Sequence, residues 1–336
     1  MAKYTIVLIP GDGIGPEVVG ASRRVLEAAG LSAEWVELPA GAKAIELGFE
    51  NVLPQRTLAA IQAHRVALKG PVTTPIGGGF TSVNVQLRKK LNLYAAVRPV
   101  RSMPGVKTRY ENVDLVVIRE NTEGLYSGIE NEVTPGVVTS LKVATEAACT
   151  RIARFAFRYA TRHHRKKITV FHKANIMKMT DGLFLKCARR IYEEEYPNIE
   201  YDELIIDAAC MKVVQDPTRF DIVLCENLYG DVVSDLCAAL VGGLGVVPGA
   251  NLGDDVAVFE AVHGSAPDIA GKGLANPLAC IMSGVMMLNH LHEQEMAENI
   301  KRAYDAVLAE GKSLTRDLGG SATTNEFTDM IIRHLG

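Results

Sequence analysis

The chain has 336 residues, of which 48% are hydrophobic and 22% charged, and its formal net charge at pH 7 is -3. This length exceeds the size at which one core usually stops growing, so we expect two lobes around a cleft. No run of about eighteen apolar residues is present that could cross a bilayer, and the small negative charge gives no general attraction for nucleic acid. The composition therefore predicts a soluble protein with neither a membrane nor a nucleic acid as partner.

The cysteines and the N-terminus indicate the compartment. Six cysteines lie in mostly apolar segments without CxxC spacing, which favours reduced thiols in the core over disulfides or zinc. They are Cys149, Cys187, Cys210, Cys225, Cys237 and Cys280. The first residues, MAKYTIVLIPGDG, turn from a short apolar strand into glycines without the pattern of a signal peptide. We therefore expect a cytoplasmic protein.

The N-terminal part opens with strand, glycine turn and helix. Residues 4–10 have the pattern of a buried strand, and the amphipathic helix after them ends at Gly30. The glycines at 11, 13 and 15 have the spacing GxGxG instead of the dinucleotide fingerprint GxGxxG, so a structural turn explains them as well as cofactor binding does. Further on we predict strands at 33–39 and 65–70, helices at 40–48 and 54–63, and a glycine-rich loop at 71–79.

Residues 81–101 gather hydroxyl, amide and arginine side chains next to this loop. If a helix begins near Ser82, then Asn84 and Arg88 lie one turn apart on one stripe, while Ser82 lies on another. Both stripes can face a ligand, so the stretch is a candidate for binding a polyanion.

A strand is predicted at 94–101, and Pro99 is expected to end its regular pairing just after Arg98. The guanidinium groups of Arg88, Arg98 and Arg119 could each bind a carboxylate through two parallel hydrogen bonds, which a lysine cannot do. From spacing alone, three solvated surface arginines explain the pattern equally well.

Strands and helices alternate through the rest of the chain, which predicts a layered and largely parallel sheet. Two short strands around Pro135-Gly136 indicate an arm or a small separate sheet. The expected strands are residues 114–121, 137–145, 167–173, 199–207 and 220–227, and the expected helices are residues 145–163 and 178–196.

The helix after residue 227 carries Asp231 and Asp235, four residues apart, so both carboxylates face the same side. They could hold a divalent cation, or they could simply favour the positive end of the helix dipole. A strand from 256 then runs into a long loop of small residues up to 273, and Pro277 begins another helix.

Taken together, seven motifs resemble the β-decarboxylating dehydrogenases, the family of isocitrate, homoisocitrate and 3-isopropylmalate dehydrogenases. The motifs are GDGIGPE, GPVTTPIGGG, SVNVQLRKKLNLYAAVRPVRS, RENTEGLYSG, HKANIMK, NLYGDVVSDL and HGSAPDIAGKGLANP. The resemblance covers essentially the whole chain, from Gly11 to about Thr324. The resemblance implies a two-domain α/β fold that is not Rossmann, with the active site in the cleft between the domains. It also implies a homodimer with shared active sites.

The resemblance implies a division of the chain and a role for each matching residue. The large cofactor-binding domain would be residues 1–98 with 255–336, and residues 99–254 would form a small domain with a dimerisation arm and the metal-site aspartates. The catalytic acid and base would be Tyr126 and Lys173, the latter from the partner subunit. The substrate ligands would be Ser82, Asn84, Arg88, Arg98 and Arg119. The ligands of Mg²⁺ or Mn²⁺ would be Asp231, Asp235 and Asp207, the last from the partner subunit. The cofactor would contact Thr74, His263, Gly264, Ala266, Asp268, Ile269 and Asn276.

These roles imply oxidative decarboxylation of isocitrate to 2-oxoglutarate and carbon dioxide in the tricarboxylic acid cycle. Ser82 and Asn84 resemble the isocitrate pattern, in which they hydrogen-bond the γ-carboxylate. Isopropylmalate enzymes carry leucines here, and residues 81–86 contain none. Homoisocitrate differs by a single methylene, which a pocket distinguishes only weakly, so it remains the alternative substrate.

The resemblance favours NAD as cofactor. Asp268 and Ile269 stand where NADP-using relatives tend to have lysine and tyrosine, and a carboxylate there would repel a 2′-phosphate. Arg316 argues the other way, since it lies near another position that contacts the 2′-phosphate. Two other classes are weighed: a noncatalytic regulatory subunit, and a metal-free Rossmann dehydrogenase for 2-hydroxy acids.

Overall fold

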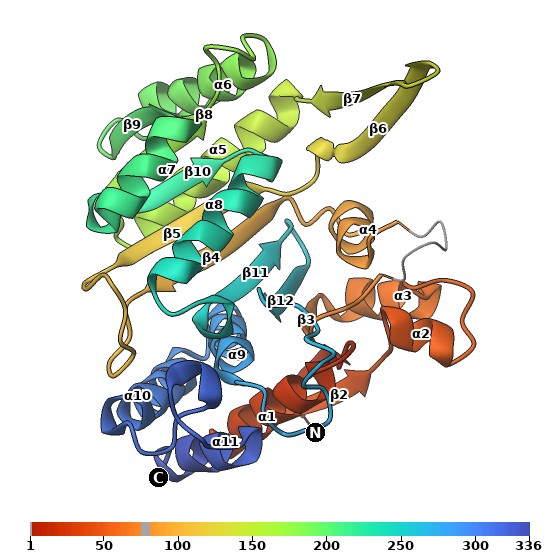
Figure 1. The fold of residues 1–336 in the computed structure, drawn as a ribbon, viewed down its shortest axis with the longest axis vertical. Helices are drawn as coiled ribbons and strands as arrows, with labels where there is room; N and C mark the ends of the chain where they lie inside the picture. The colour runs from red at the N-terminus through yellow and green to blue at the C-terminus, as the bar shows by residue number, and fades with distance from the viewer. Residues whose placement is uncertain (1, 75–80) are drawn as a thin grey trace. The chain divides into compact units, whose positions relative to one another are not determined.

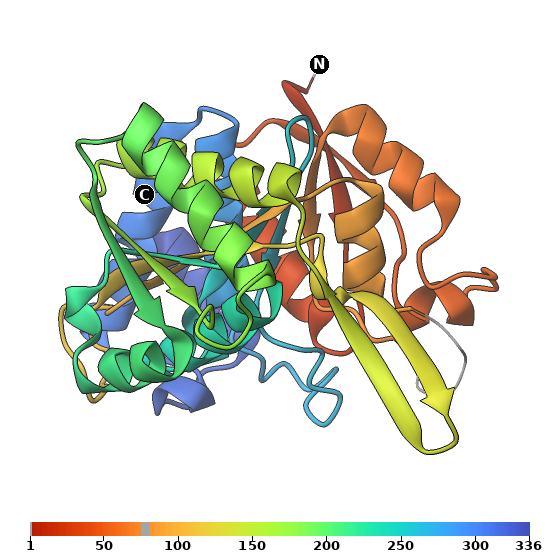
Figure 2. The same ribbon diagram turned by 90° about the horizontal axis from the view of Figure 1, so that it is seen from above.

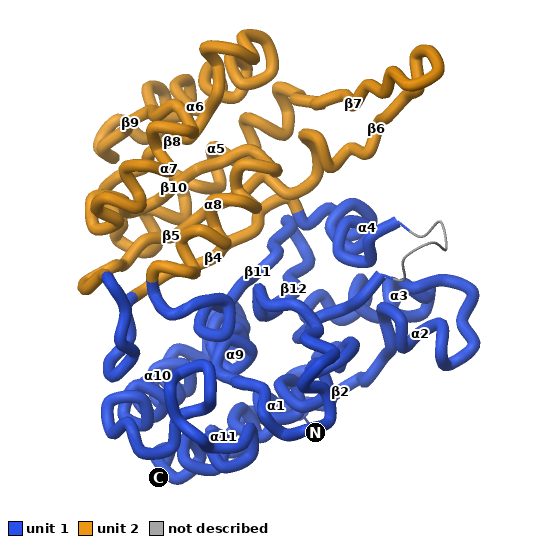
Figure 3. The backbone as a smooth tube through the Cα atoms, viewed as in Figure 1, with its two compact units in different colours: residues 1–93, 102–109, 241–336 blue, residues 94–101, 110–240 orange. Residues whose placement is uncertain are grey.

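The structure is a computed structural model that describes residues 2–74 and 81–336, so the end of the predicted glycine-rich loop lies outside the described residues. The chain forms two compact units, both assembled from separate segments (Figure 3). Unit 1 comprises Met1–Leu93, Ser102–Arg109 and Val241–Gly336, and unit 2 comprises Tyr94–Arg101 and Tyr110–Leu240. Residues 94–101 group with unit 2 because they form a strand that pairs along its whole length inside that unit.

Unit 1 contains strands in the order β2-β1-β3-β12-β11. The strands are β1 (Tyr4–Ile9), β2 (Ala33–Glu37), β3 (Val66–Lys69), β11 (Pro248–Leu252) and β12 (Ala257–Ala261). All neighbours are parallel except β11 and β12, which are antiparallel. The apolar runs predicted as buried strands are confirmed: Ile6, Val7 and Ile9 of β1 are fully buried.

The helices of unit 1 cover its strands (Figure 1). They are α1 (Gly15–Ala28), α2 (Ala42–Glu46), α3 (Gln55–His64), α4 (Val83–Lys90), α9 (Leu278–His290), α10 (Gln294–Glu310) and α11 (Thr324–Arg333), with short 3-10 turns η2 (Leu244–Val246) and η3 (Arg316–Leu318). Helix α4 begins directly after Ser82, as predicted. It packs through Val83 and Leu87 onto a core shared with β1, β3 and α3, and this packing fixes the polar side of α4.

Unit 2 contains strands in the order β4-β5-β10-β8-β9. The strands are β4 (Ala95–Arg101), β5 (Asp114–Glu120), β8 (Lys167–His172), β9 (Glu200–Ile205) and β10 (Ile222–Cys225). The prediction that Pro99 ends the pairing of its strand is wrong, because Pro99 pairs with Val116 in the antiparallel β4–β5 ladder. Alternate residues of such a ladder do not donate their N–H to that partner, so a proline can be tolerated there.

Two pairs of helices cover the faces of the unit 2 strands, α5 (Glu146–Arg162) with α6 (Thr180–Glu195) and α7 (Ile206–Gln215) with α8 (Asn227–Leu240) (Figure 1). A short 3-10 turn, η1 (Pro217–Arg219), precedes β10. Strands β6 (Gly124–Thr134) and β7 (Val137–Val143) form the separate hairpin predicted around Pro135-Gly136. This hairpin, here called the arm, extends away from the rest of unit 2 (Figure 2).

Four of the described helices and strands were not predicted, namely α7, β11 and the C-terminal helices α10 and α11. Helix α7 begins at Ile206, directly after β9, whereas the sequence pattern extended the strand to residue 207. Strand β11 was also missed, because Pro248, Gly249 and Asn251 are unfavourable in strands. Within residues 2–74 and 81–336, no helix combines the length and apolar character needed to span a bilayer.

Candidate active site

Two carboxylates of helix α8 and two arginines form one cluster in unit 2. Arg98 places Nη1 3.3 Å from Oδ1 of Asp235 and Nη2 3.7 Å from Oδ1 of Asp231. Arg119 is completely buried, donates Nη1 to Asp231, and donates Nε and Nη2 to Oδ1 of Asn227 at 3.0 and 2.7 Å. The structure therefore brings together two of the predicted substrate ligands and two of the predicted metal ligands.

Gly230 makes the position of Arg119 possible. A Cβ atom at Gly230 would lie 2.5 Å from Cγ of Arg119, which is too close for any other residue without movement. Because β5 lies beside α8, the glycine lets the buried guanidinium reach both Asn227 and Asp231. Asn227 is the first residue of the NLYGDVVSDL motif but was not predicted as a site residue, because its contact with Arg119 is visible only in the fold.

Tyr126 of β6 completes this cluster. Its hydroxyl donates to Oδ2 of Asp231, and the Arg119 guanidinium lies 5.0 Å from the centre of its ring. Burial, together with the hydrogen bond to Asp231, raises the pKa of Tyr126. The phenol therefore keeps its proton at neutral pH, which suits a general acid.

Lys173 and Asp207 form a second pair in unit 2. Lys173 follows β8, Asp207 lies in the first turn of α7, and Nζ of the lysine is 2.5 Å from Oδ1 of the aspartate. The hydrogen bond from Lys173 lowers the pKa of Asp207. The carboxylate is 69% exposed, so a neighbouring molecule can reach it.

One chain brings together only part of the ligand set that a hard divalent cation would need. Asp231 and Asp235 offer adjacent carboxylates that are 33% and 55% exposed, and Mg²⁺ and Mn²⁺ prefer such oxygen ligands. Nevertheless, among the residues that the structure describes, no three His, Cys, Asp or Glu side chains gather as a metal site. Two predicted ligands are thus together, and the third, Asp207, is held elsewhere by Lys173.

The remaining predicted substrate ligands lie on or next to α4 in unit 1. Ser82 is the exposed residue at its N-terminus, and Oδ1 of Asn84 is buried and accepts no hydrogen bond from the described residues. Arg88 is largely buried, with Nη2 3.9 Å from Oε1 of Glu260. Glu260 also receives Lys69 Nζ at 2.5 Å, so a buried ion cluster supports the base of the α4 site.

Predicted cofactor residues lie in two loops of unit 1. Thr74 accepts a hydrogen bond from the N–H of Val83 at 3.1 Å and so caps α4. His263 is half-buried, and burial lowers its pKa, so the imidazole is neutral at pH 7. Its Nε2 is buried and makes no hydrogen bond to the described residues. Gly264 and Ala266 follow, and Ala266 has a strained φ of +36°.

The other end of this loop is more open. Asp268 is exposed and Ile269 is half-buried, so the carboxylate of Asp268 is accessible to a ligand. Asn276 donates Nδ2 to Oδ2 of Asp317 at 2.8 Å and accepts from the N–H of Leu278 at 3.0 Å, which orders the start of α9. Arg316 is exposed in η3.

The glycines of GDGIG allow other parts of the backbone to approach closely, because they have no Cβ atom. A Cβ at Gly11 would lie 2.1 Å from the carbonyl oxygen of Pro71, and one at Gly13 would lie 1.9 Å from that of Ser265. The carboxylate of Asp12, which sequence reasoning did not single out, accepts N–H groups from Ala42, Lys43 and Thr73. The structural explanation of this turn therefore accounts for its glycines.

Comparisons with known proteins agree along the whole chain. A model of the isocitrate/isopropylmalate dehydrogenase family matches residues 5–331. The NAD isocitrate dehydrogenase catalytic subunit 5 of Arabidopsis thaliana mitochondria is 54% identical over 98% of this chain and 88% of the relative. A mitochondrial NAD isocitrate dehydrogenase regulatory subunit from Dictyostelium discoideum is 49% identical over 98% of this chain and 91% of the relative. A solved isocitrate dehydrogenase structure from Methylococcus capsulatus has a TM-score of 0.95 and 50% identity, over 99% of each chain.

Proposed function

Because the chain belongs to the isocitrate/isopropylmalate dehydrogenase family, we propose that it oxidises isocitrate with NAD and releases carbon dioxide and 2-oxoglutarate. The observation that carries the proposal is the cluster of Arg98, Arg119, Tyr126, Asp231 and Asp235. It combines groups that bind carboxylates, a protonated phenol and two oxygen ligands for a cation. A tricarboxylic substrate that is oxidised and decarboxylated needs each of these.

The proposed roles are those that membership of the family implies, and the chemistry of each side chain is consistent with its role. Asp231, Asp235 and the partner's Asp207 would hold Mg²⁺ or Mn²⁺, which when bound supplies Lewis-acid stabilisation of negative charge on the substrate 2-oxygen. Lys173 of the partner subunit would take the proton of the 2-hydroxyl as the C2 hydride passes to the nicotinamide of NAD. After carbon dioxide is lost, Tyr126 would donate a proton to the enolate carbon.

Substrate recognition is proposed to rest on charge and hydrogen bonding. Arg98 and Arg119 would bind substrate carboxylates through their guanidinium planes, and Arg88 would do the same from α4. Ser82 and Asn84 would hydrogen-bond the γ-carboxylate. Asn84 would do so through Nδ2, because an amide oxygen and a carboxylate both only accept hydrogen bonds. Its Oδ1, which is buried and has no partner among the described residues, would instead gain from a ligand hydroxyl.

Steady-state turnover tests this function. The purified chain should show its highest kcat/KM for isocitrate with NAD and Mg²⁺ when compared with homoisocitrate, 3-isopropylmalate and NADP. Preference for homoisocitrate would keep the reaction and change the substrate. Full turnover in excess chelator would instead indicate a metal-free 2-hydroxy acid dehydrogenase.

A regulatory subunit is the second candidate, because one relative of 49% identity is named a regulatory subunit. Tyr126, Lys173 and the three aspartates argue for catalysis. The two functions separate in one experiment: a catalytic chain turns over isocitrate when purified alone, whereas a regulatory chain does so only after a catalytic subunit is added.

For the cofactor, we propose that Asp268 binds the adenosine ribose of NAD, since its carboxylate is exposed on the loop after His263. Replacing Asp268 by lysine should lower kcat/KM with NAD about tenfold, because the ribose hydroxyls lose their carboxylate acceptor. It should raise kcat/KM with NADP about tenfold, because the lysine attracts the 2′-phosphate that the carboxylate repels. The control is Asp305→Lys, on α10 in the same unit. An unchanged ratio of NADP to NAD efficiency in Asp268→Lys would contradict the role.

We further propose a homodimer in which a second copy covers the exposed face around Lys173. Large apolar side chains are exposed on the loop after Lys173 and on α7 and α8, with exposed fractions from 39% to 88%: Ile176, Met179, Met211, Val214 and Val232. Monomers rarely leave such groups in water, so a partner of similar character is expected. The arm adds exposed valines and Leu141. Light scattering should give twice the chain mass.

Sharing of active sites makes a strong prediction for mixed dimers. Tyr126→Phe and Lys173→Met should each abolish most turnover, because one removes the acid of its own site and the other removes the base of the partner's site. Co-expression with two affinity tags yields mixed dimers in which one site keeps both groups. These should regain about half of the wild-type turnover. Mixed dimers that stay inactive would contradict sharing.

The reaction proposed would place the protein in the tricarboxylic acid cycle. The cytoplasmic location expected from the sequence is kept here as a proposal, although several relatives are named as mitochondrial proteins. Cell fractionation with an antibody against the chain tests it: recovery with an organelle would overturn the cytoplasmic location without affecting the proposed chemistry.

A further inference from the structure

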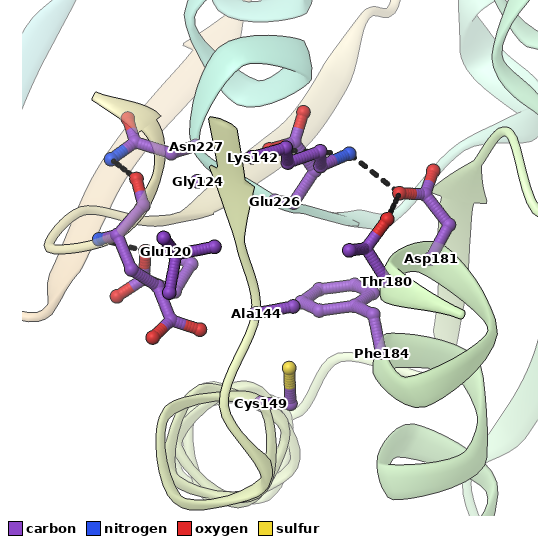
Figure 4. A pocket seen from close by; sticks show the side chains of 12 residues that line it. Glu120, Gly124, Lys142, Ala144, Cys149, Thr180, Asp181, Phe184, Glu226 and Asn227 are labelled. Carbon is purple, nitrogen blue, oxygen red and sulfur yellow. Dashed lines mark hydrogen bonds and ion pairs between the residues drawn. The ribbon is translucent and has the colours of Figure 1, made fainter. Parts of the chain in front are cut away.

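A buried ion cluster lies next to Lys173 in unit 2, and the proposed chemistry does not use it. Asp181 is 2% exposed and Glu226 8%, and the side chain of Lys142 is 11% exposed. Nζ of Lys142 is 2.5 Å from Oδ1 of Asp181 and 3.7 Å from Oε2 of Glu226. Figure 4 shows these three side chains beside one another at a cavity of about 20 Å³, which has room for about one water molecule.

Asp181 joins this cluster to the lysine proposed as the base. Its Oδ2 accepts the backbone N–H of Lys173 at 2.7 Å, while its own N–H donates to the carbonyl of Met177. The N–H groups of Ile176 and Met177 in turn donate to the carbonyl of Lys173. Asp181 lies in the first turn of α6, where an aspartate usually only favours the helix dipole. Here its side chain instead closes the loop at 173–181.

Lys142 joins the cluster to the arm. It lies near the end of β7, and its ammonium is 4.6 Å from the centre of the Tyr229 ring on α8. Glu226, just before α8, accepts the N–H of Tyr229 at 2.9 Å. One buried ammonium therefore contacts the root of the arm, the loop of Lys173 and the start of the helix that carries Asp231 and Asp235.

We propose that Asp181 is a positioning residue for Lys173, anchored by Lys142, so that the root of the arm sets the place from which Lys173 serves the partner's active site. A buried ion pair is costly unless its charges are satisfied. Asp181 pairs with the ammonium of Lys142 through Oδ1 and at the same time accepts the backbone N–H of Lys173 through Oδ2. The inference rests on the shared active sites proposed above. It adds that a change at Asp181 acts on the partner's turnover and leaves the chemistry of its own Tyr126 site intact.

Mixed dimers test this placement. Asp181→Asn homodimers should lose about 10- to 100-fold in kcat, because a misplaced catalytic group is costly even at small displacements. Paired with Tyr126→Phe, the Asp181→Asn chain should regain about half of the wild-type turnover, since one site then has an intact Tyr126 and a correctly held Lys173. Paired with Lys173→Met, it should stay at the low level of its homodimer. Recovery with Tyr126→Phe also demonstrates that the Asp181→Asn chain folds.

The matched control is Asp202→Asn, which breaks an exposed pair 3.5 Å from Lys167 on the neighbouring strand β8 and should keep wild-type turnover. Wild-type kcat in Asp181→Asn homodimers would overturn the inference, and so would recovery with Lys173→Met but not with Tyr126→Phe. If Tyr126→Phe and Lys173→Met fail to complement each other, the shared site itself is wrong and both proposals fall.

Discussion

Asp235→Asn should lower kcat/KM for isocitrate by about 10²- to 10³-fold while the thermal midpoint changes little. The reason is that Asp235 is 55% exposed and its ion pair in unit 2 is a single 3.3 Å contact with Arg98, so the fold loses little when its charge is removed. Its proposed task is to hold the cation that stabilises negative charge on the substrate. Loss of one group that takes part in such charge stabilisation lowers the rate by about 10²- to 10³-fold. Titration of Mn²⁺ by electron paramagnetic resonance should show correspondingly weaker binding.

Asp231→Asn is the informative comparison. Asp231 accepts from the fully buried Arg119 and from Tyr126, so this substitution removes the cation ligand and also leaves a buried guanidinium without its carboxylate. Because Arg119 is fully buried while Asp231 is 33% exposed, we expect a cost of about 1–3 kcal/mol, and therefore a lower thermal midpoint in addition to lost activity. Equal thermal midpoints for the two variants, or Mn²⁺ affinity unchanged in both, would contradict the roles assigned to these aspartates.

Many elements of the fold followed from periodicity where a turn residue separated them, although the C-terminal helices α10 and α11 were not predicted. Strand β1, the glycine turn and α1 were predicted in order, and so was the arm around Pro135-Gly136. Helix α7 was missed because no breaker separates it from β9: Ile205 ends the strand and Ile206 begins the helix. As a result Asp207 was placed at a strand end, whereas it lies in the first turn of a helix.

Contacts between distant residues could not be predicted from sequence. Asp231 and Asp235 share a helix face by spacing, but their contact with Arg98 depends on β4 lying near α8. Lys69 gives a clearer case. It lies within the strand predicted at 65–70 and was given no role of its own, yet it is 1% exposed. Its burial is possible because the parallel β3–β12 register sets Glu260 directly beside it.

Glu260→Gln should therefore lower the free energy of unfolding by about 3 kcal/mol at pH 7. Burial alone would raise the pKa of Glu260, but Lys69 and Arg88 outweigh it and hold the pKa down to about 2, from an ordinary value of 4.5. Each unit of pKa shift corresponds to about 1.4 kcal/mol, so the carboxylate stabilises the fold by about this amount once it is ionised in both states. Glu200→Gln, which removes a 64% exposed partner of Lys167, should cost under about 0.5 kcal/mol.

The sign of the pH dependence separates this explanation from simple loss of packing. Since the folded pKa lies below the unfolded one, the stabilisation is complete above about pH 5 and is lost as the pH falls toward 2. In urea titrations the gap between wild type and Glu260→Gln should thus shrink steadily over that window. A gap that stays constant from pH 7 to pH 3 would mean that shape, and not charge, is responsible. Because Arg88 lies 3.9 Å from Glu260, the variant should also raise the KM for isocitrate.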